Sequence, residues 1–306
     1  MMEGIVERRQ SCDVLRRVRM GAKGTLLRWL HGTNPHHWGD DPADFDADAV
    51  ASTLARLSGP VFGPRGWFRV EARGFERIPA GPVMVVSNHS GGTSIPDVWG
   101  FLWLWYRAFG TSRPLHPSAH EMILSAPAIA RWCARRGVVR ADPTLARAVL
   151  TEWRRDLMVM PGGDLDTWRP WSRRYEVEFG GRLGYARTAL RARVPVVPVA
   201  HAGAHETLMV LTDGRRFAEL VGLQRVARAA VWPVHLSLPW GLAIGPWPHL
   251  PTPATLRYRV GEPIAPPASL TEGAEPDDDM VRDLDARIRE SVQSMLYELR
   301  DERAKP

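Results

Sequence analysis

The side chains best placed for chemistry are those of His89 and Asp97, which flank a short loop rich in small residues. His89 follows four apolar residues, 83–86, that predict a buried strand, and Pro96 suits the first turn of a helix that Asp97 then enters. A histidine at the end of a strand can meet an aspartate at the start of the next helix, and that pairing makes an imidazole into a base. A histidine held in a loop for structural reasons is the alternative, and the motifs further along the chain favour the base.

Predicted strands and helices alternate through most of the chain. The strands are expected at 67–73, 83–86, 137–140, 157–160, 194–199 and 255–260, and the helices at 44–57, 127–136, 143–156, 181–193 and 277–303. Alternation of this kind is typical of an α/β fold, with a largely parallel central sheet flanked by helices. The loops at the carboxyl ends of such strands gather at one edge of the sheet, so we expect His89 to lie among them.

Three parts of the chain are expected: an N-terminal helical segment at 1–66, an α/β domain at 67–265, and a linker with an amphipathic helix at 266–306. Residues 11–30 combine an apolar face with several arginines, and such a helix either lies on an anionic membrane surface or packs on its own domain. The polar and charged N-terminus does not predict a signal peptide, and without an apolar run of about 20 residues no transmembrane helix is expected. The protein is therefore predicted to be cytoplasmic and peripheral on the membrane.

The composition argues against some partners. The formal net charge is +6, and the basic residues are scattered arginines apart from Lys23 and Lys305, so a nucleic-acid groove is not expected. The two cysteines, Cys12 and Cys133, provide neither a disulfide framework nor a metal cluster. We therefore expect a reducing compartment and no bound metal.

Two apolar stretches stand apart from the rest. Residues 98–106 are too apolar for an exposed helix and too short to span a bilayer, which leaves a buried helix, the reading that we favour, or a wall against a lipid chain. Residues 229–251 carry no formal charge, and their prolines and glycines break any helix. This second stretch predicts an irregular apolar surface that dips into a membrane or lines a lipid tunnel, with a buried connection as the alternative.

Four sequence blocks stand in order, each in or just after a predicted strand. They are Asn88-His89, Gly137-Val138-Val139-Arg140, Met160-Pro161-Gly162-Gly163 and Val194-Pro195-Val196-Val197-Pro198. Together they resemble the phospholipid/glycerol acyltransferase family over about residues 67–265, which would make this stretch an acyltransferase domain. The resemblance implies an enzyme that moves a fatty acyl group from an acyl thioester to a lipid hydroxyl at a membrane surface. Acyl-CoA or an acyl carrier protein would be the co-substrate, with no resident cofactor.

Two positions depart from the family pattern. The family places an aspartate where this chain has Ser94, and the nearest aspartate is Asp97, three residues later. The flexible pair Gly91-Gly92 would let the longer loop return Asp97 to the histidine. In the third block, Gly162 takes the place of the usual glutamate, as in the diacylglycerol-acyltransferase-like branch. That resemblance favours a neutral lipid hydroxyl over glycerol phosphate or lysophosphatidate as the acceptor.

The resemblance and the chemistry together give each site residue an expected role. His89 would be the general base, and Asp97 would fix and stabilise its imidazole. Arg140 would contact the acceptor or the phosphates of the donor. Backbone N–H groups around Gly91 and Gly92, or in the third block, are candidates to bind the oxyanion. The substrate-binding residues expected in and directly after that third block are Gly162, Gly163 and Asp164.

Other functions remain open on the sequence alone. A catalytically inactive lipid-binding or membrane-scaffold protein of the same fold is one alternative, and a thioesterase or lipid hydrolase is another. A serine hydrolase would need a nucleophile elbow, and the segment 92–96 lacks the closing glycine of that motif. His201, His205 and Glu206, which follow the fourth block, either line the same pocket or serve as structural polar groups.

Overall fold

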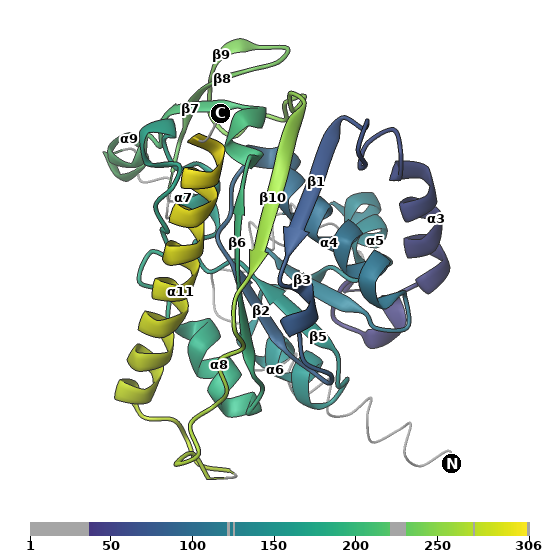
Figure 1. The fold of residues 1–306 in the computed structure, drawn as a ribbon, viewed down its shortest axis with the longest axis vertical. Coiled ribbons are helices and arrows are strands. Elements are labelled where there is room, and N and C mark those ends of the chain that lie inside the picture. The colour runs from purple at the N-terminus through teal and green to yellow at the C-terminus, as the bar shows by residue number, and fades with distance from the viewer. Residues whose placement is uncertain (1–36, 121–122, 125, 221–230, 272, 305–306) are drawn as a thin grey trace.

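Helices pack on both faces of a seven-stranded sheet, and a smaller three-stranded sheet lies at one end of the molecule (Figure 1). The computed structural model of the chain describes residues 37–120, 123–124, 126–220, 231–271 and 273–304. The expected membrane-binding helix at 11–30 lies outside these residues.

Neighbouring strands of the large sheet come from distant parts of the chain. In spatial order they are β1 (Phe68–Arg73), β10 (Ala254–Val260), β6 (Val196–Ala202), β2 (Met84–Ser87), β5 (Asp156–Val159), β3 (Leu115–Ala119) and β4 (Val139–Arg140). β6, β2, β5, β3 and β4 run parallel to one another, whereas β10 is antiparallel to β6 and β1 is parallel to β10. The predicted α/β fold with a largely parallel sheet is confirmed, and the parallel strands end at one edge.

The alternation of side chains along β2 divides the core into two halves. Val83 and Val85 face one apolar cluster, Met84 and Val86 face the other, and all four are fully buried. A strand covered on both faces is expected to be a continuous apolar run, as this one is. The helices on the Met84 side are α6 (Pro143–Thr151), α8 (Gly184–Ala192) and α11 (Asp278–Ala304). Those on the other side are α3 (Ala47–Leu57), α4 (Pro96–Phe109) and α5 (Pro127–Ala134).

Helix α4 contains the apolar stretch 98–106. Pro96 occupies its first turn, where a missing N–H costs nothing, and the helix ends at Gly110. Its buried apolar side chains are those of Val98, Phe101, Leu102, Trp103, Trp105 and Tyr106. The stretch is therefore the buried helix that was predicted. Within the described residues, no helix is both long enough and apolar enough to cross a bilayer.

Segments on both sides of the expected 67–265 domain pack on its layers. Helix α11 lies along β6, and α3 packs against α4 (Figure 1). The remaining short elements connect the larger ones. They are η1 (Pro42–Asp44), η2 (Phe75–Arg77), η3 (Gly92–Ser94), α7 (Asp164–Thr167), η4 (Trp171–Arg173), η5 (Ala204–Thr207) and α9 (Arg215–Leu220).

The small sheet consists of three antiparallel strands. These are β7 (Met209–Thr212), β8 (Val234–Ser237) and β9 (Gly241–Ile244). The prediction of an irregular backbone at 229–251 was wrong for 234–244, which form a β-hairpin. Proline is disfavoured inside a strand because it lacks the N–H that the ladder needs. Pro233, Pro239 and Pro246 all fall outside β8 and β9, so the two strands can pair.

Candidate active site

His89 follows β2 at the edge where the parallel strands end. The residue before it, Asn88, is fully buried and makes two hydrogen bonds with the backbone of His201. Asn88 Nδ2 donates to His201 O at 3.0 Å, and His201 N donates to Asn88 Oδ1 at 2.9 Å. This pair ties the end of β2 to β6 and so fixes where His89 leaves the sheet.

The loop after His89 is wound into one 3-10 turn, η3 (Gly92–Ser94). Gly91 and Gly92 have positive φ angles of 99° and 63°, which glycine adopts at little cost. Ile95 also has a positive φ, 41°, which is a strained conformation for a β-branched residue. This tightly wound path takes up the extra length of the loop and brings the start of α4 back to His89.

The imidazole of His89 and the carboxylate of Asp97 are in direct contact. His89 Nδ1 lies 2.6 Å from Asp97 Oδ2, which also accepts from the backbone N–H of Ser90 at 3.0 Å. His201 Nε2 lies 3.1 Å from the same oxygen. Burial alone would raise the pKa of the Asp97 carboxyl, but the imidazoles of His89 and His201 outweigh burial and lower that pKa. The carboxylate therefore stays ionised, and Nδ1 of His89 carries the proton that it donates.

The cluster opens to solvent through His89. The exposed fraction of the His89 side chain is 13%, against 0% for Asp97 and 1% for His201. The Tyr258 hydroxyl donates to the backbone oxygen of Asp97 at 2.7 Å and so anchors the first turn of α4 to β10. With Nδ1 turned toward Asp97, Nε2 of His89 is the nitrogen left to take a proton from a bound molecule.

Two imidazoles and a carboxylate are also the ligand types of many metal centres. In this cluster both rings contact one carboxylate oxygen at hydrogen-bond distance, 2.6 Å for His89 and 3.1 Å for His201, which leaves no space for an ion between them. Across the described part of the chain, no group of three or more His, Cys, Asp or Glu residues is arranged to hold a metal.

The third sequence block reaches the histidine through Asp166 rather than Asp164. Asp166 Oδ2 accepts from the backbone N–H of His89 at 2.5 Å, and Asp166 Oδ1 accepts from the N–H of Glu178 at 3.2 Å. Gly162 packs directly on this carboxylate, because a Cβ added there would come within 2.3 Å of the Asp166 Cβ. The glycine at this position is therefore a requirement of close packing.

Asp164 and the carbonyls before it are held by Arg182. Arg182 Nη2 donates to Asp164 Oδ1 at 2.8 Å, and Arg182 Nη1 donates to the carbonyl oxygen of Gly162 at 2.9 Å. Gly163, with a φ of 50°, lies against the same guanidinium. These contacts fix the backbone of the block, and a substrate-binding role for its residues stays a prediction.

A second buried ion pair, between Arg169 and Asp166, supports the block. Arg169 is 1% exposed, and its Nη2 lies 3.2 Å from His205 Nε2. Burial, together with the charge of Arg173, lowers the pKa of Arg169 to about 9, and burial also holds the pKa of His205 well below its ordinary value. His205 is therefore neutral and accepts from the arginine. The sequence reasoning missed this pair, although an acid and an arginine three residues apart follow the Pro-Gly-Gly block directly.

Arg140 lies at the same edge of the sheet as His89 but is not brought into contact with it. β4 is separated from β2 by β5 and β3, which puts the two residues roughly 14 Å apart at the usual strand spacing. Arg140 Nε donates to Asp40 Oδ1 at 3.1 Å. Asp40 is 100 residues away in the sequence, so no local pattern could have predicted that it pairs with Arg140.

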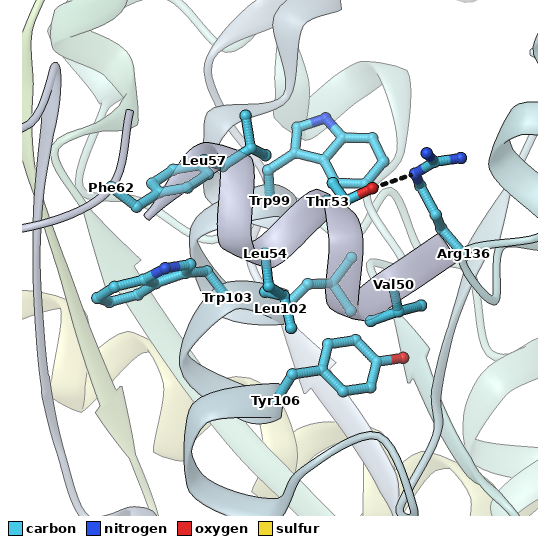
Figure 2. A pocket seen from close by; sticks show the side chains of 10 residues that line it. All are labelled: Val50, Thr53, Leu54, Leu57, Phe62, Trp99, Leu102, Trp103, Tyr106 and Arg136. Atoms are coloured by element: carbon cyan, nitrogen blue, oxygen red, sulfur yellow. Dashed lines mark hydrogen bonds between the residues drawn. The ribbon is translucent and has the colours of Figure 1, made fainter. Parts of the chain in front are cut away.

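A small cavity lies between α3 and α4 (Figure 2). Its volume is about 30 Å³, which suits about one water molecule and is too small for an acyl chain. The residues that line it are Val50, Thr53, Leu54, Leu57, Phe62, Trp99, Leu102, Trp103, Tyr106 and Arg136. Its polar end is closed by a hydrogen bond from Arg136 Nε to Thr53 Oγ1 at 2.9 Å. The lining includes no member of the His89 cluster, so we assign it no substrate.

Curated relatives of the chain occur in mycobacteria. An uncharacterized protein of Mycobacterium tuberculosis is 31% identical over 237 residues, which cover 77% of this chain and 63% of that protein. An uncharacterized protein of Mycobacterium leprae is 28% identical over 237 residues, covering 77% of this chain and 61% of that protein. The chain thus spans less than two thirds of the length of these relatives.

The chain is also similar to one solved structure and, over part of its length, to one family model. The solved 1-acyl-sn-glycerophosphate acyltransferase PlsC from Thermotoga maritima is similar with a TM-score of 0.46 and 14% identity, over 94% of this chain and 86% of that one. Residues 69–202 match the family model described as Acyltransferase. The matched residues run from β1 to the end of β6 and include His89, Asp97 and His201. The family model therefore confirms, over these residues, the resemblance to an acyltransferase family that the sequence blocks predicted.

Proposed function

We propose that the protein is an O-acyltransferase that moves a fatty acyl group from an acyl thioester to the hydroxyl of a lipid, with His89 as the general base. The match of residues 69–202 to the Acyltransferase family model supports acyl transfer. The observation that carries the role of His89 is its contact, at 2.6 Å, with the buried and ionised carboxylate of Asp97. This contact orients the ring and leaves Nε2 for the substrate.

The proposed reaction follows from the weak nucleophilicity of an alcohol at neutral pH. Nε2 of His89 takes the hydroxyl proton while the acceptor oxygen forms its bond to the thioester carbonyl carbon. Asp97 stabilises the resulting imidazolium. When the tetrahedral intermediate collapses, the C–S bond breaks and the imidazolium returns the proton to the departing thiolate, which regenerates His89.

Groups around the base have proposed roles in binding charge. The backbone N–H groups of Gly91 and Gly92, in the turn just after His89, are candidates for the oxyanion, with the backbone of the third block as the second choice. Arg140 is a candidate for the phosphates of coenzyme A. Its distance from His89 of roughly 14 Å suits a donor whose phosphates lie far from its thioester.

A neutral lipid hydroxyl is the acceptor that we favour. The support is the glycine at position 162, where the family more often has glutamate, together with its tight packing on Asp166, which excludes any side chain. A lipid acceptor also implies that the protein works at a membrane surface, peripherally and on the cytoplasmic side.

The test is thiol release from palmitoyl-coenzyme A, with lysophosphatidate, lysophospholipids, mono- and diacylglycerol and a long-chain alcohol offered in turn. We expect release that requires one neutral acceptor and that falls by at least about 10²-fold in His89→Ala. Tyr297→Ala, an exposed change on α11, is the matched control, and thermal unfolding checks that both variants fold.

Each other outcome has a clear meaning. Release without any acceptor would identify a thioesterase. Lipid binding without release for any donor and acceptor pair would identify an inactive lipid-binding protein. Release that requires lysophosphatidate would overturn the neutral acceptor but leave the acyltransferase in place.

A further inference from the structure

Exposed apolar side chains concentrate on the hairpin of β8 and β9 and on the segment that follows it. We call this set the hairpin surface, and its members are Leu236, Leu238, Trp240, Leu242, Ile244 and Trp247. Their exposed fractions range from 43% at Leu236 to 63% at Leu242. The hairpin projects from the end of the molecule (Figure 1). A contiguous apolar surface of this kind on a globular protein marks a site of interaction.

The strand register shows that the outer face of the small sheet is consistently apolar. Met209, Leu236 and Leu242 lie opposite one another across the three strands, and all three are exposed. The next row, which includes His235 and Ala243, is buried. An antiparallel sheet with one solvated face normally turns polar side chains to water. This sheet instead presents aliphatic side chains outward, so its outer face is built for an apolar environment.

The exposed tryptophans need no water to satisfy their indole groups. Trp240 Nε1 donates to the Pro248 carbonyl at 2.6 Å, and Trp247 Nε1 donates to the Ile244 carbonyl at 2.8 Å. The stretch 229–256 contains no Asp, Glu, Lys or Arg. Insertion of this surface into hydrocarbon would therefore bury no formal charge and would leave neither indole N–H without a hydrogen-bond partner.

We propose that the hairpin surface is the membrane-docking site, and that it inserts into the acyl region of a lipid bilayer. Its base adjoins the active-site loop, because Thr93 Oγ1 donates to Trp247 O at 2.9 Å and Ser94 Oγ lies 3.3 Å from His249 Nε2. A lipid that leaves the bilayer beside the hairpin thus meets the loop that carries His89. The choice of a bilayer as the occupant rests on the proposed function, which requires a lipid acceptor.

A basic rim completes the match to a bilayer. Trp67, half exposed, donates from its Nε1 to the Pro251 carbonyl at 2.7 Å, which extends the apolar surface to the start of β1. Arg65 and Arg69, on either side of Trp67, are exposed. Arginines at the border of an inserted apolar surface are at the right depth to reach lipid phosphates.

A second copy of this chain is the competing occupant, through pairing at the outer edge of β9. That strand has only four residues, and Pro246 and Pro248 follow it, so the edge offers a short ladder. The bilayer is therefore the better fit, and self-association becomes an outcome of the test.

The experiment measures sedimentation of the full chain with vesicles of 70% phosphatidylcholine and 30% phosphatidylglycerol. The variant is Trp240→Ser/Leu242→Ser. The matched control is Tyr297→Ser/Ile129→Ser, which removes one exposed aromatic and one exposed aliphatic side chain from α11 and α5. We expect the hairpin variant to lose at least about tenfold in vesicle partitioning and the control to bind as the wild type does. Leu236→Ser/Ile244→Ser is a second hairpin pair in case the first is poorly folded.

Vesicle binding by both hairpin variants equal to that of the wild type would overturn the proposal and place binding elsewhere in the chain. Wild-type dimers that become monomers in the hairpin variant, with vesicle binding unchanged, would assign the surface to self-association instead. Sedimentation with vesicles does not require catalysis, so it tests the docking site independently of the proposed acyltransferase activity. Binding lost in the variant while no acceptor supports thiol release would retain the docking site and reject the acyltransferase.

Discussion

The two sheets of the molecule distribute polar and apolar side chains in opposite ways. The large sheet buries its polar groups: Asn88 and His201 at the ends of β2 and β6, and Asp97 beside them, are nearly or wholly inaccessible. The small sheet exposes its apolar groups, with Leu236 and Leu242 turned outward. The large sheet therefore holds a polar cluster in a dry environment, as the proposed proton transfer requires, whereas the small sheet presents the apolar surface that the proposed membrane docking requires.

The two regions meet at the loop after His89. The hydrogen bond from Thr93 to the Trp247 carbonyl and the close approach of Gly92 to His249 join the active-site turn to the end of the hairpin segment. If the comparison is right, changes in the buried cluster affect the chemistry without affecting membrane binding, and changes in the hairpin do the reverse. A change at the junction affects the alignment of the base.

The largest effect is expected for Asp97→Asn, which tests whether the buried cluster carries the chemistry. An amide at this position cannot stabilise an imidazolium and favours the wrong tautomer of His89, so kcat/KM for thiol release is expected to fall by about 10²–10⁴-fold. Vesicle sedimentation of the same variant is expected to match the wild type. A loss of only a few fold in kcat/KM would show that the 2.6 Å contact does not orient the base.

A smaller effect is expected at the junction, from Gly92→Ala. A Cβ at Gly92 would lie 2.6 Å from His249 Nε2 and 2.9 Å from a methyl carbon of Leu208, and the φ of 63° adds backbone strain. We expect about a 10- to 100-fold loss of kcat/KM, together with roughly 1–3 kcal/mol of unfolding free energy measured in urea.

Gly181→Ala is the matched control for Gly92→Ala. Gly181 has a similar φ of 67°, but no atom lies within 4 Å of an added Cβ, so this change introduces strain without a clash. It is expected to cost about 1 kcal/mol and to leave thiol release unchanged. Equal effects of the two changes on activity would mean that the contact between Gly92 and His249 does not matter for the base.

Much of the large sheet could be predicted from the sequence because its central strands are covered on both faces. Runs such as 83–86 and 194–199 are continuous in apolar residues and flanked by turn formers. The meeting of His89 with Asp97 could also be anticipated, since a proline marks the start of α4 and two glycines precede it. Both features depend on residues that are close together in the chain, and such patterns can be recognised from one sequence alone.

The parts that escaped prediction depend on contacts between distant residues. β3 is a five-residue strand interrupted by Pro117 and carrying His116, so its composition does not resemble a core strand. Asp166 could not be told from Asp164, because only the packing against Gly162 decides which carboxylate reaches His89. The hairpin in 229–251 was not predicted because its prolines indicate irregular backbone, whereas they lie next to the two strands and not inside them.

The last prediction concerns stability in acid, which tests whether the two sheets unfold together. His116, in the large sheet, is buried with Nδ1 2.8 Å from the Gly137 carbonyl oxygen, and burial lowers its pKa to about 4. Between this value and the ordinary pKa of about 6.5, the unfolded chain binds more protons than the folded chain, so stability is lost as the pH falls from 6.5 toward 4. When the pH is lowered from 7.5 to 5, the depressed pKa of His116 is expected to reduce the free energy of unfolding by on the order of 2 kcal/mol.

Urea unfolding at these two pH values, on the wild type and His116→Gln, measures this cost, because glutamine can still donate to Gly137 but does not titrate. A drop in stability as large in His116→Gln as in the wild type would contradict the assignment. His235→Gln is the equivalent change in the small sheet, where Nε2 lies 3.0 Å from the Gly245 carbonyl oxygen and burial likewise lowers the pKa. If the sheets unfold as one unit, both variants reduce the acid loss in a single transition. If the hairpin opens on its own, His235→Gln leaves the main transition unchanged, and the hairpin surface is thermodynamically separate from the part of the large sheet that carries His89.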